Sequence, residues 1–187
     1  MGARRPAGPG DRRGLDGSRR ADTLPRVTTL PPVTLPRLGF WCHRHGRRAR
    51  QISEDILLAG ADDRTNLALQ VTDGALAVYT YLTGSVPRDQ VEAVREVVDE
   101  LGAREPAPVI VLRVEEPAAD AEQAEGPDPL DPAGVSVTAR VEQPTSVVDG
   151  MTDAQMDAWL NWATALVDST AADVAATLPL TRPREES

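Results

Sequence analysis

The feature that most constrains the fold is a hairpin pattern, NLALQVTDGALAVYTYL, over residues 66–82. Two runs of alternating apolar and small or polar residues flank Asp73-Gly74, a residue pair that suits a type I′ turn. Pairing across this turn places Leu69 opposite Val78, so these side chains lie on one face of a sheet. We expect that face to lie in the core.

Helical and strand patterns alternate after the hairpin. VPRDQVEAVREVVDEL predicts a helix over 86–101, because its valines recur at helical spacing. A capping box, Thr152 with Gln155 three residues later, predicts the start of a second helix over 153–178. The apolar run at 109–112 predicts a strand that is either covered on both faces or central in the sheet, and GVSVTARVEQ predicts a further strand. Upstream, SEDILLAGADD is compatible with either a short helix or a first strand.

These elements predict one α+β domain over residues 51–180, with a mainly antiparallel sheet of about four strands and two principal helices. Residues 1–50 hold 12 Arg and 3 Asp and are rich in Pro and Gly, so we expect a basic, disordered tail. We expect residues 1 to about 45 to add nothing to stability. Two alternatives stay open: a basic arm for nucleic acid or acidic partners, or a start codon assigned too early. An acidic loop is expected over 116–134 and a disordered tail over 181–187.

Side chains that carry common catalytic chemistry are scarce. His43, His45 and Cys42 all lie in the expected tail, and the chain contains no Lys. Residues 51–180 therefore lack the side chains for Ser-His-Asp triads, Cys-His pairs and most zinc sites. The run CHRH offers only three ligands, one fewer than a structural zinc site needs. We predict no catalytic residues, no metal and no cofactor, with an enzyme that uses carboxylates as one alternative.

Charge and hydropathy bear on partners and location. Residues 51–187 carry 8 Arg and 26 acidic residues, which disfavours direct nucleic-acid binding by this part of the chain. The single Cys42 fits a reducing compartment. There is no apolar run of 18 residues and no secretory signal pattern, so we expect a cytoplasmic protein without a membrane segment.

Aromatic residues are few, and four of the six lie on the hairpin and the last helix. Trp159 falls within the apolar stripe of the last helix and is predicted to be core. Trp162 falls at the edge of that stripe. Because interfaces favour Trp and Tyr, we predict that Trp162, Tyr79 and Tyr81 form one partner-binding surface. The alternative is that the chain's own loops cover them.

The order of elements resembles the YbjN family and the related type III secretion chaperones, the CesT-like group. The resemblance rests on LALQVTDGALAVYTYL, on VPRDQVEAVREVVDEL directly after it, and on the ending in which a strand leads through a Gly-containing turn into the T-x-x-Q helix. It implies an α+β sheet with helices packed on one face, a homodimer, and a role in holding peptides or partner proteins.

We therefore predict a non-enzymatic peptide- or protein-binding module of the chaperone-like or regulatory kind. Its partner would be a client peptide or protein, plausibly encoded by a neighbouring gene. The third hypothesis is that the chain is a structural subunit of a larger assembly. A pocket in which two carboxylates converge would favour an enzyme, and insolubility of the isolated chain would favour a structural subunit.

Overall fold

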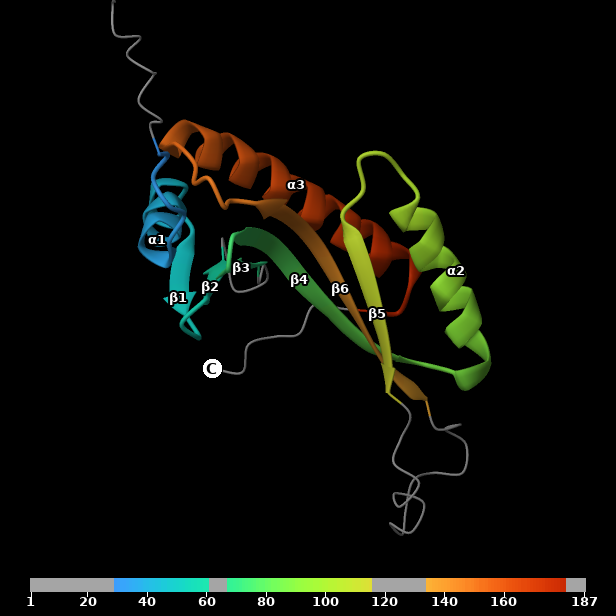
Figure 1. Ribbon diagram of the computed structural model, residues 1–187. Helices are drawn as coiled ribbons and strands as arrows, with labels where there is room; N and C mark the ends of the chain where they lie inside the picture. The colour runs from blue at the N-terminus through green and yellow to red at the C-terminus, as the bar shows by residue number, and fades with distance from the viewer. Residues whose placement is uncertain (1–28, 61–66, 116–133, 181–187) are drawn as a thin grey trace, which may run out of the picture.

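The computed structural model describes residues 29–60, 67–115 and 134–180. Within these ranges the chain has an α+β fold, with one antiparallel sheet and three α-helices (Figure 1). In chain order the elements are α1 (Leu35–Arg44), β1 (Arg48–Gln51), β2 (Ile56–Gly60), β3 (Leu67–Thr72), β4 (Ala75–Val86), the 3-10 helix η1 (Arg88–Gln90), α2 (Val91–Gly102), β5 (Val109–Glu115), β6 (Val135–Ser146) and α3 (Asp153–Thr177). Expectations for 1–28, for 116–133 and for 181–187 lie outside the described residues.

The sheet has six strands in the order β1-β2-β3-β4-β6-β5, and not about four. The two additional strands are β1, whose four exposed residues show no apolar alternation, and β2, whose sequence is compatible with either a helix or a strand. The hairpin register is confirmed, since Leu69 pairs with Val78. Its turn differs from the expected type I′, which needs a positive φ at both central residues: Gly74 has φ +80°, but Asp73 does not have a positive φ.

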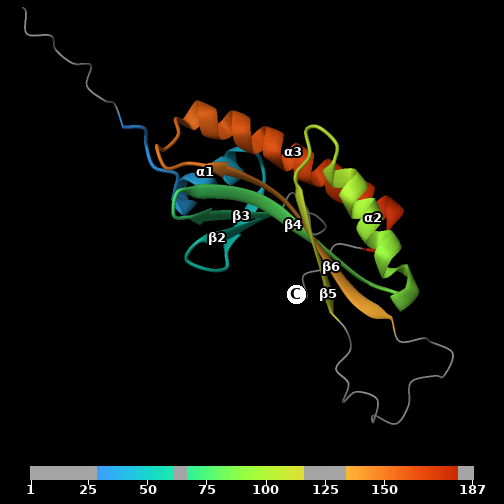
Figure 2. The same cartoon turned by 45° about the vertical axis from the view of Figure 1, so that its right-hand side comes forward.

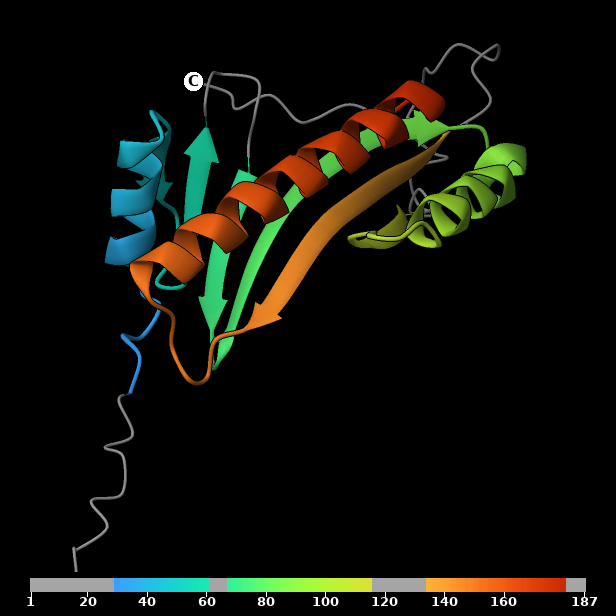
Figure 3. The ribbon, with the colours of Figure 1, turned by 90° about the horizontal axis from the view of Figure 1, so that it is seen from above.

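The three helices pack on one face of the sheet (Figure 3), which we call the inner face. The long strands β4 and β6 pair along their whole length and turn alternate side chains toward α3. Leu76, Val78, Val137, Val141 and Leu160 are all buried in this single core. α1 covers β1 and β2, while α2 packs against β5 and the end of α3, as Figure 2 also shows. Only α2 and α3 are principal helices.

The expectation of a disordered tail over 1–50 is wrong for the residues that form α1 and β1. The density of prolines argues against a helix here, but Pro36 stands in the first turn of α1, where the missing N–H costs little. Leu38, Trp41 and Cys42 follow at helical spacing and are buried in the main core. The folded domain therefore begins before residue 50.

The two predicted helices are present with shifted ends. The segment predicted as helix 86–101 begins as the 3-10 helix η1 and continues as α2 to Gly102. For α3 the capping box is confirmed: Gln155 N donates to Thr152 Oγ1 at 3.2 Å, and Thr152 N donates to Gln155 Oε1 at 2.9 Å. No helix in the described part of the chain has the length and apolar character needed to cross a membrane.

Ion pairs fasten α1 to the first turns of α3. Arg37 donates to Asp153 Oδ1 at 2.6 Å and to three backbone carbonyls, among them Met151 O. Arg44 and His45 both donate to Asp157 Oδ1, at 2.6 and 2.7 Å. The hydrogen bond from His45, supported by the charge of Arg44, holds the pKa of Asp157 below its usual value. These contacts fix α1 against the rest of the domain.

We predict that Gly150→Ala lowers the free energy of unfolding by about 1–3 kcal/mol. Gly150 has φ +77°, and an added Cβ would lie 2.5 Å from Pro31 O, where the N-terminal segment crosses the turn before α3. Gly102→Ala is the matched control, because an added Cβ there meets nothing within 4 Å. Urea denaturation of both variants checks this, and an equally mild effect at both glycines contradicts it.

Candidate functional site

The outer face of the sheet, opposite the helices, carries two of the three predicted partner-binding residues. No described helix packs on this face. The pairing of β4 with β6 and of β6 with β5 aligns the outer side chains in rows across the three strands. One row consists of Tyr79, Glu142 and Val109, and the next consists of Tyr81, Arg140 and Val111.

The two tyrosines and the central arginine form one cluster. The rings of Tyr79 and Tyr81 meet edge to face, with centroids 5.4 Å apart. The guanidinium carbon of Arg140 lies 3.9 Å from the Tyr79 centroid, a cation–π contact that contributes roughly 0.5–2 kcal/mol. Arg140 Nε also lies 2.9 Å from Glu142 Oε2, an ion pair without the direction of a hydrogen bond. These contacts hold the Arg140 side chain against the Tyr79 ring on the outer face of the sheet.

Tyr79 and Tyr81 differ in exposure and therefore in what they can do. Tyr79 is buried, and its burial, reinforced by Tyr81, raises the pKa of its phenol above the ordinary value, although Arg140 opposes the shift. Tyr81 is 40% exposed. The buried Tyr79 ring therefore packs against Tyr81, whereas the exposed Tyr81 ring is the one that a partner can reach.

Strand β5 adds exposed apolar side chains to the same face. Val109 and Val111 are 52% and 51% exposed, so the prediction of a strand covered on both faces or central in the sheet is wrong. β5 is the edge of the sheet, and its inner-face residues alone contact the core. The sequence indicates this arrangement. Arg113 and Glu115 follow the two valines at every second position, so these four side chains point to the same side of β5, which the charged pair marks as solvent-facing.

The structure does not bring Trp162 to the tyrosines. Trp162 lies on α3, on the helix-covered side of the sheet, whereas Tyr79 and Tyr81 point from the opposite side. Its side chain is 45% exposed. Trp159, predicted as core, is partly buried and packs against the edge of the core. The three predicted residues therefore do not form one surface. The exposed apolar and aromatic side chains that do share one face are those of Tyr81, Val109 and Val111, which we call the exposed strip.

The chemistry of this face suits contact with apolar and aromatic groups. Among the described residues, no three His, Cys, Asp or Glu side chains converge as metal ligands. Three pockets lined by described residues contain at most one carboxylate each. On the outer face itself, the carboxylate in the first row, Glu142, is paired with Arg140.

Comparison with known proteins bears on the fold. No family model matches the chain, and no curated protein matches it. Among solved structures the chain is similar to YbjN from E. coli, described as a proposed transcription regulator, with a TM-score of 0.54 and 12% sequence identity. The match covers 82% of this chain and 99% of the YbjN chain. At this identity the likeness concerns the fold alone, which is YbjN-like.

Proposed function

We propose that this chain is a non-enzymatic protein-binding module, of the regulatory or chaperone-like kind, that holds an extended segment of a client protein. The observation that carries the proposal is the exposed strip of Tyr81, Val109 and Val111, on a sheet face that no described helix covers and beside an edge strand whose outer side pairs with no described strand. Large contiguous apolar patches on the surface of a folded domain mark interaction sites, whereas single scattered apolar residues do not.

An edge strand offers a specific way to bind such a segment. On the side of β5 away from β6, no described strand pairs with its backbone. An extended peptide can add to such an edge through backbone hydrogen bonds, while its side chains contact the neighbouring face. A client docked on β5 would therefore place alternate side chains beside Val109, Val111 and, across the strand, Tyr81. No cofactor or metal is needed for this function.

The alternatives have less support. A carboxylate-dependent enzyme needs two carboxylates in one pocket, whereas the pocket between α1 and α3 contains only Asp153 and the pocket at the β3–β4 turn contains only Asp73. The similar YbjN structure is described as that of a proposed regulator, a description that concerns YbjN and not this chain. It fits a binding protein better than an enzyme. A purely structural subunit remains a separate prediction, tested by whether the chain is soluble alone.

Three further expectations belong to the same proposal. A relationship to type III secretion chaperones is one of them, and it would explain a role in holding clients. A homodimer would follow if a second copy pairs along β5 or contacts Trp162, and sedimentation of the full chain tests it. A cytoplasmic location, with a client encoded nearby, would place the protein where it meets its client as that client is made.

We predict that Val111→Lys abolishes client binding without affecting the fold. Val111 is half exposed on an edge strand, so the free energy of unfolding should change by less than about 1 kcal/mol. A photo-reactive amino acid at position 111 should cross-link to one or a few proteins in cells of the source organism. Affinity for the captured client should then fall at least tenfold in Val111→Lys.

Val148 provides the matched control. It is also an exposed valine, 76% accessible, but it lies in the turn before α3 and away from β5. A photo-reactive group at position 148 should give no specific product, and Val148→Lys should bind the client normally. Identical cross-linking patterns at the two positions would show that the β5 strip is not the client site.

A further inference from the structure

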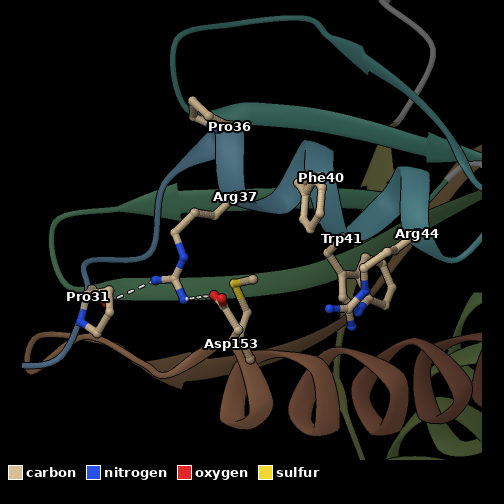
Figure 4. A pocket seen from close by; sticks show the side chains of 8 residues that line it. Pro31, Pro36, Arg37, Phe40, Trp41, Arg44 and Asp153 are labelled. Atoms are coloured by element: carbon tan, nitrogen blue, oxygen red, sulfur yellow. Dashed lines mark hydrogen bonds and ion pairs between the residues drawn. The ribbon is translucent and has the colours of Figure 1, made fainter.

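A second candidate site lies at the other end of the sheet, between α1 and the beginning of α3. A pocket of about 440 Å³ opens there (Figure 4). Figure 4 shows Arg37, Phe40 and Trp41 projecting from α1 toward α3. The volume lies within the range of protein pockets that hold small organic molecules. The pocket is therefore large enough for a ligand of that kind.

The lining of the pocket is mainly apolar and aromatic. Its apolar side chains are those of Pro31, Pro36, Phe40, Trp41 and Met156. Phe40 is 64% exposed although its neighbour Trp41 is buried, so the core does not use the Phe40 ring. Aromatic rings and the methionine thioether both pack favourably against a further ring. The lining therefore favours a ligand with an apolar, ring-bearing body.

The arginines at the pocket are already paired. Arg37 donates to Asp153 Oδ1 at 2.6 Å and to three backbone carbonyls. Arg44 donates to Asp157 Oδ1 at 2.6 Å. A charged ligand would lose its hydration here without meeting an opposite charge that is still unpaired, and such a transfer is unfavourable. The pocket therefore favours an uncharged ligand.

One hydrogen-bond donor at the pocket has no partner. The indole N–H of Trp41 is inaccessible to solvent and has no acceptor among the described residues. Buried donors without an acceptor are rare in folded domains, because the lost hydrogen bond to water is not replaced. Trp41 is one of the lining residues, so an acceptor on a ligand can reach the indole after a small rotation of the ring. This donor favours a ligand that carries an acceptor such as a carbonyl oxygen.

We propose that this pocket binds a small, uncharged aromatic ligand with a carbonyl acceptor, of the aromatic ketone or amide class. The ring of the ligand would lie beside Phe40 and Met156, and its carbonyl oxygen would accept from the Trp41 indole. The ligand class follows from the apolar lining, the paired arginines and the unpaired donor. The site is separate from the exposed strip and does not depend on the proposed function of that strip.

The test uses the full isotope-labelled chain and three probes of similar shape: acetophenone, ethylbenzene and benzoate. The chain has three tryptophans, so three indole N–H signals can be followed in a proton–nitrogen correlation spectrum. Trp159→Phe and Trp162→Phe each remove one signal, which assigns the third to Trp41 without a change among the lining residues. We expect acetophenone to shift the Trp41 signal saturably and to leave the Trp162 signal in place.

The other two probes and one variant isolate the contributions to binding. Ethylbenzene lacks the carbonyl group, so it should bind about fivefold more weakly, as expected for the loss of one hydrogen bond. Benzoate should also bind more weakly than acetophenone, because the arginines at the pocket are paired. Phe40→Ala should weaken acetophenone about fivefold through the loss of ring packing. Because Phe40 is exposed, this variant should keep the thermal midpoint of the unaltered chain.

The control variant is Val148→Ala, which removes an exposed apolar side chain elsewhere and should leave acetophenone binding unchanged. The proposal is overturned if ethylbenzene binds as tightly as acetophenone, if benzoate binds more tightly, or if no probe binds saturably. Equal shifts of the Trp41 and Trp162 signals, or binding that Phe40→Ala does not weaken, would overturn it too, since the probes would then be spread over the surface. None of these results bears on cross-linking at position 111.

Discussion

Replacing Trp41 with Ala is expected to lower the free energy of unfolding by about 3–5 kcal/mol. Trp41 has the largest volume among the fully buried side chains and joins α1 to the main core. Its removal empties a large volume, and the neighbouring backbone of α1 is held by ion pairs that limit collapse into the cavity. Urea denaturation of the full chain measures the effect.

The buried thiol of Cys42 gives a second readout of the same change. Burial raises its pKa to about 11, with Arg47 opposing the shift, so the native thiol should react slowly with a thiol reagent at pH 8. Trp41→Ala should accelerate the reaction by loosening α1.

The raised pKa of Cys42 also makes the stability of the fold depend on pH. The neutral thiol is favoured in the fold, so its contribution is complete below pH 9 and is lost as pH rises from about 9 to 11.

Phe40→Ala is the control for this prediction, because the two aromatic residues are adjacent in sequence. Phe40 is exposed, and its removal should change the free energy of unfolding by less than about 0.5 kcal/mol. If Trp41→Ala proves as mild as Phe40→Ala, α1 is not part of the core. Residues before about 45 would then add nothing to stability, as the sequence alone had suggested.

The elements that could be predicted from sequence are those whose signals are local. The hairpin register follows from strict alternation around Asp73-Gly74, and the start of α3 follows from the Thr152 capping box. Each signal depends on neighbours within a few residues, so no knowledge of distant contacts was needed. The α+β class followed from the order of these elements.

The failures have a different physical origin. The prolines before and within the first turn of α1 obscure the helical spacing of Leu38, Trp41 and Cys42, although proline is tolerated in a first helical turn. β1 has four exposed residues and therefore shows no apolar alternation. Its place in the sheet is determined by pairing with β2, which a local pattern cannot reveal.

The candidate site illustrates the same limit. The pairing of Tyr79 and Tyr81 on one face follows from their separation by two residues in a strand. Their neighbours from β6 and β5 depend on long-range pairing, so Arg140 and the exposed valines could not be placed. Trp162 was grouped with the tyrosines by residue type alone, and the sheet separates them.

Leu160→Ala should have the second large effect, a loss of about 2–5 kcal/mol in the free energy of unfolding. Leu160 is fully buried where α3 crosses β4 and β6, at the centre of the core. Trp159 lies one residue earlier and is only partly buried. Trp159→Ala should therefore lower the free energy of unfolding by less than the same substitution would at a fully buried tryptophan.

Trp162→Ala completes this comparison, because it removes a large side chain that points away from the sheet. We expect a change in unfolding free energy within about 1 kcal/mol, since the side chain is 45% exposed. Chemical denaturation should therefore place Leu160→Ala and Trp162→Ala far apart. Sedimentation of Trp162→Ala then isolates any role in self-association, because the fold is unaffected. Should Trp162→Ala unfold the protein as readily as Leu160→Ala, Trp162 supports the core and its assignment to a partner surface is wrong.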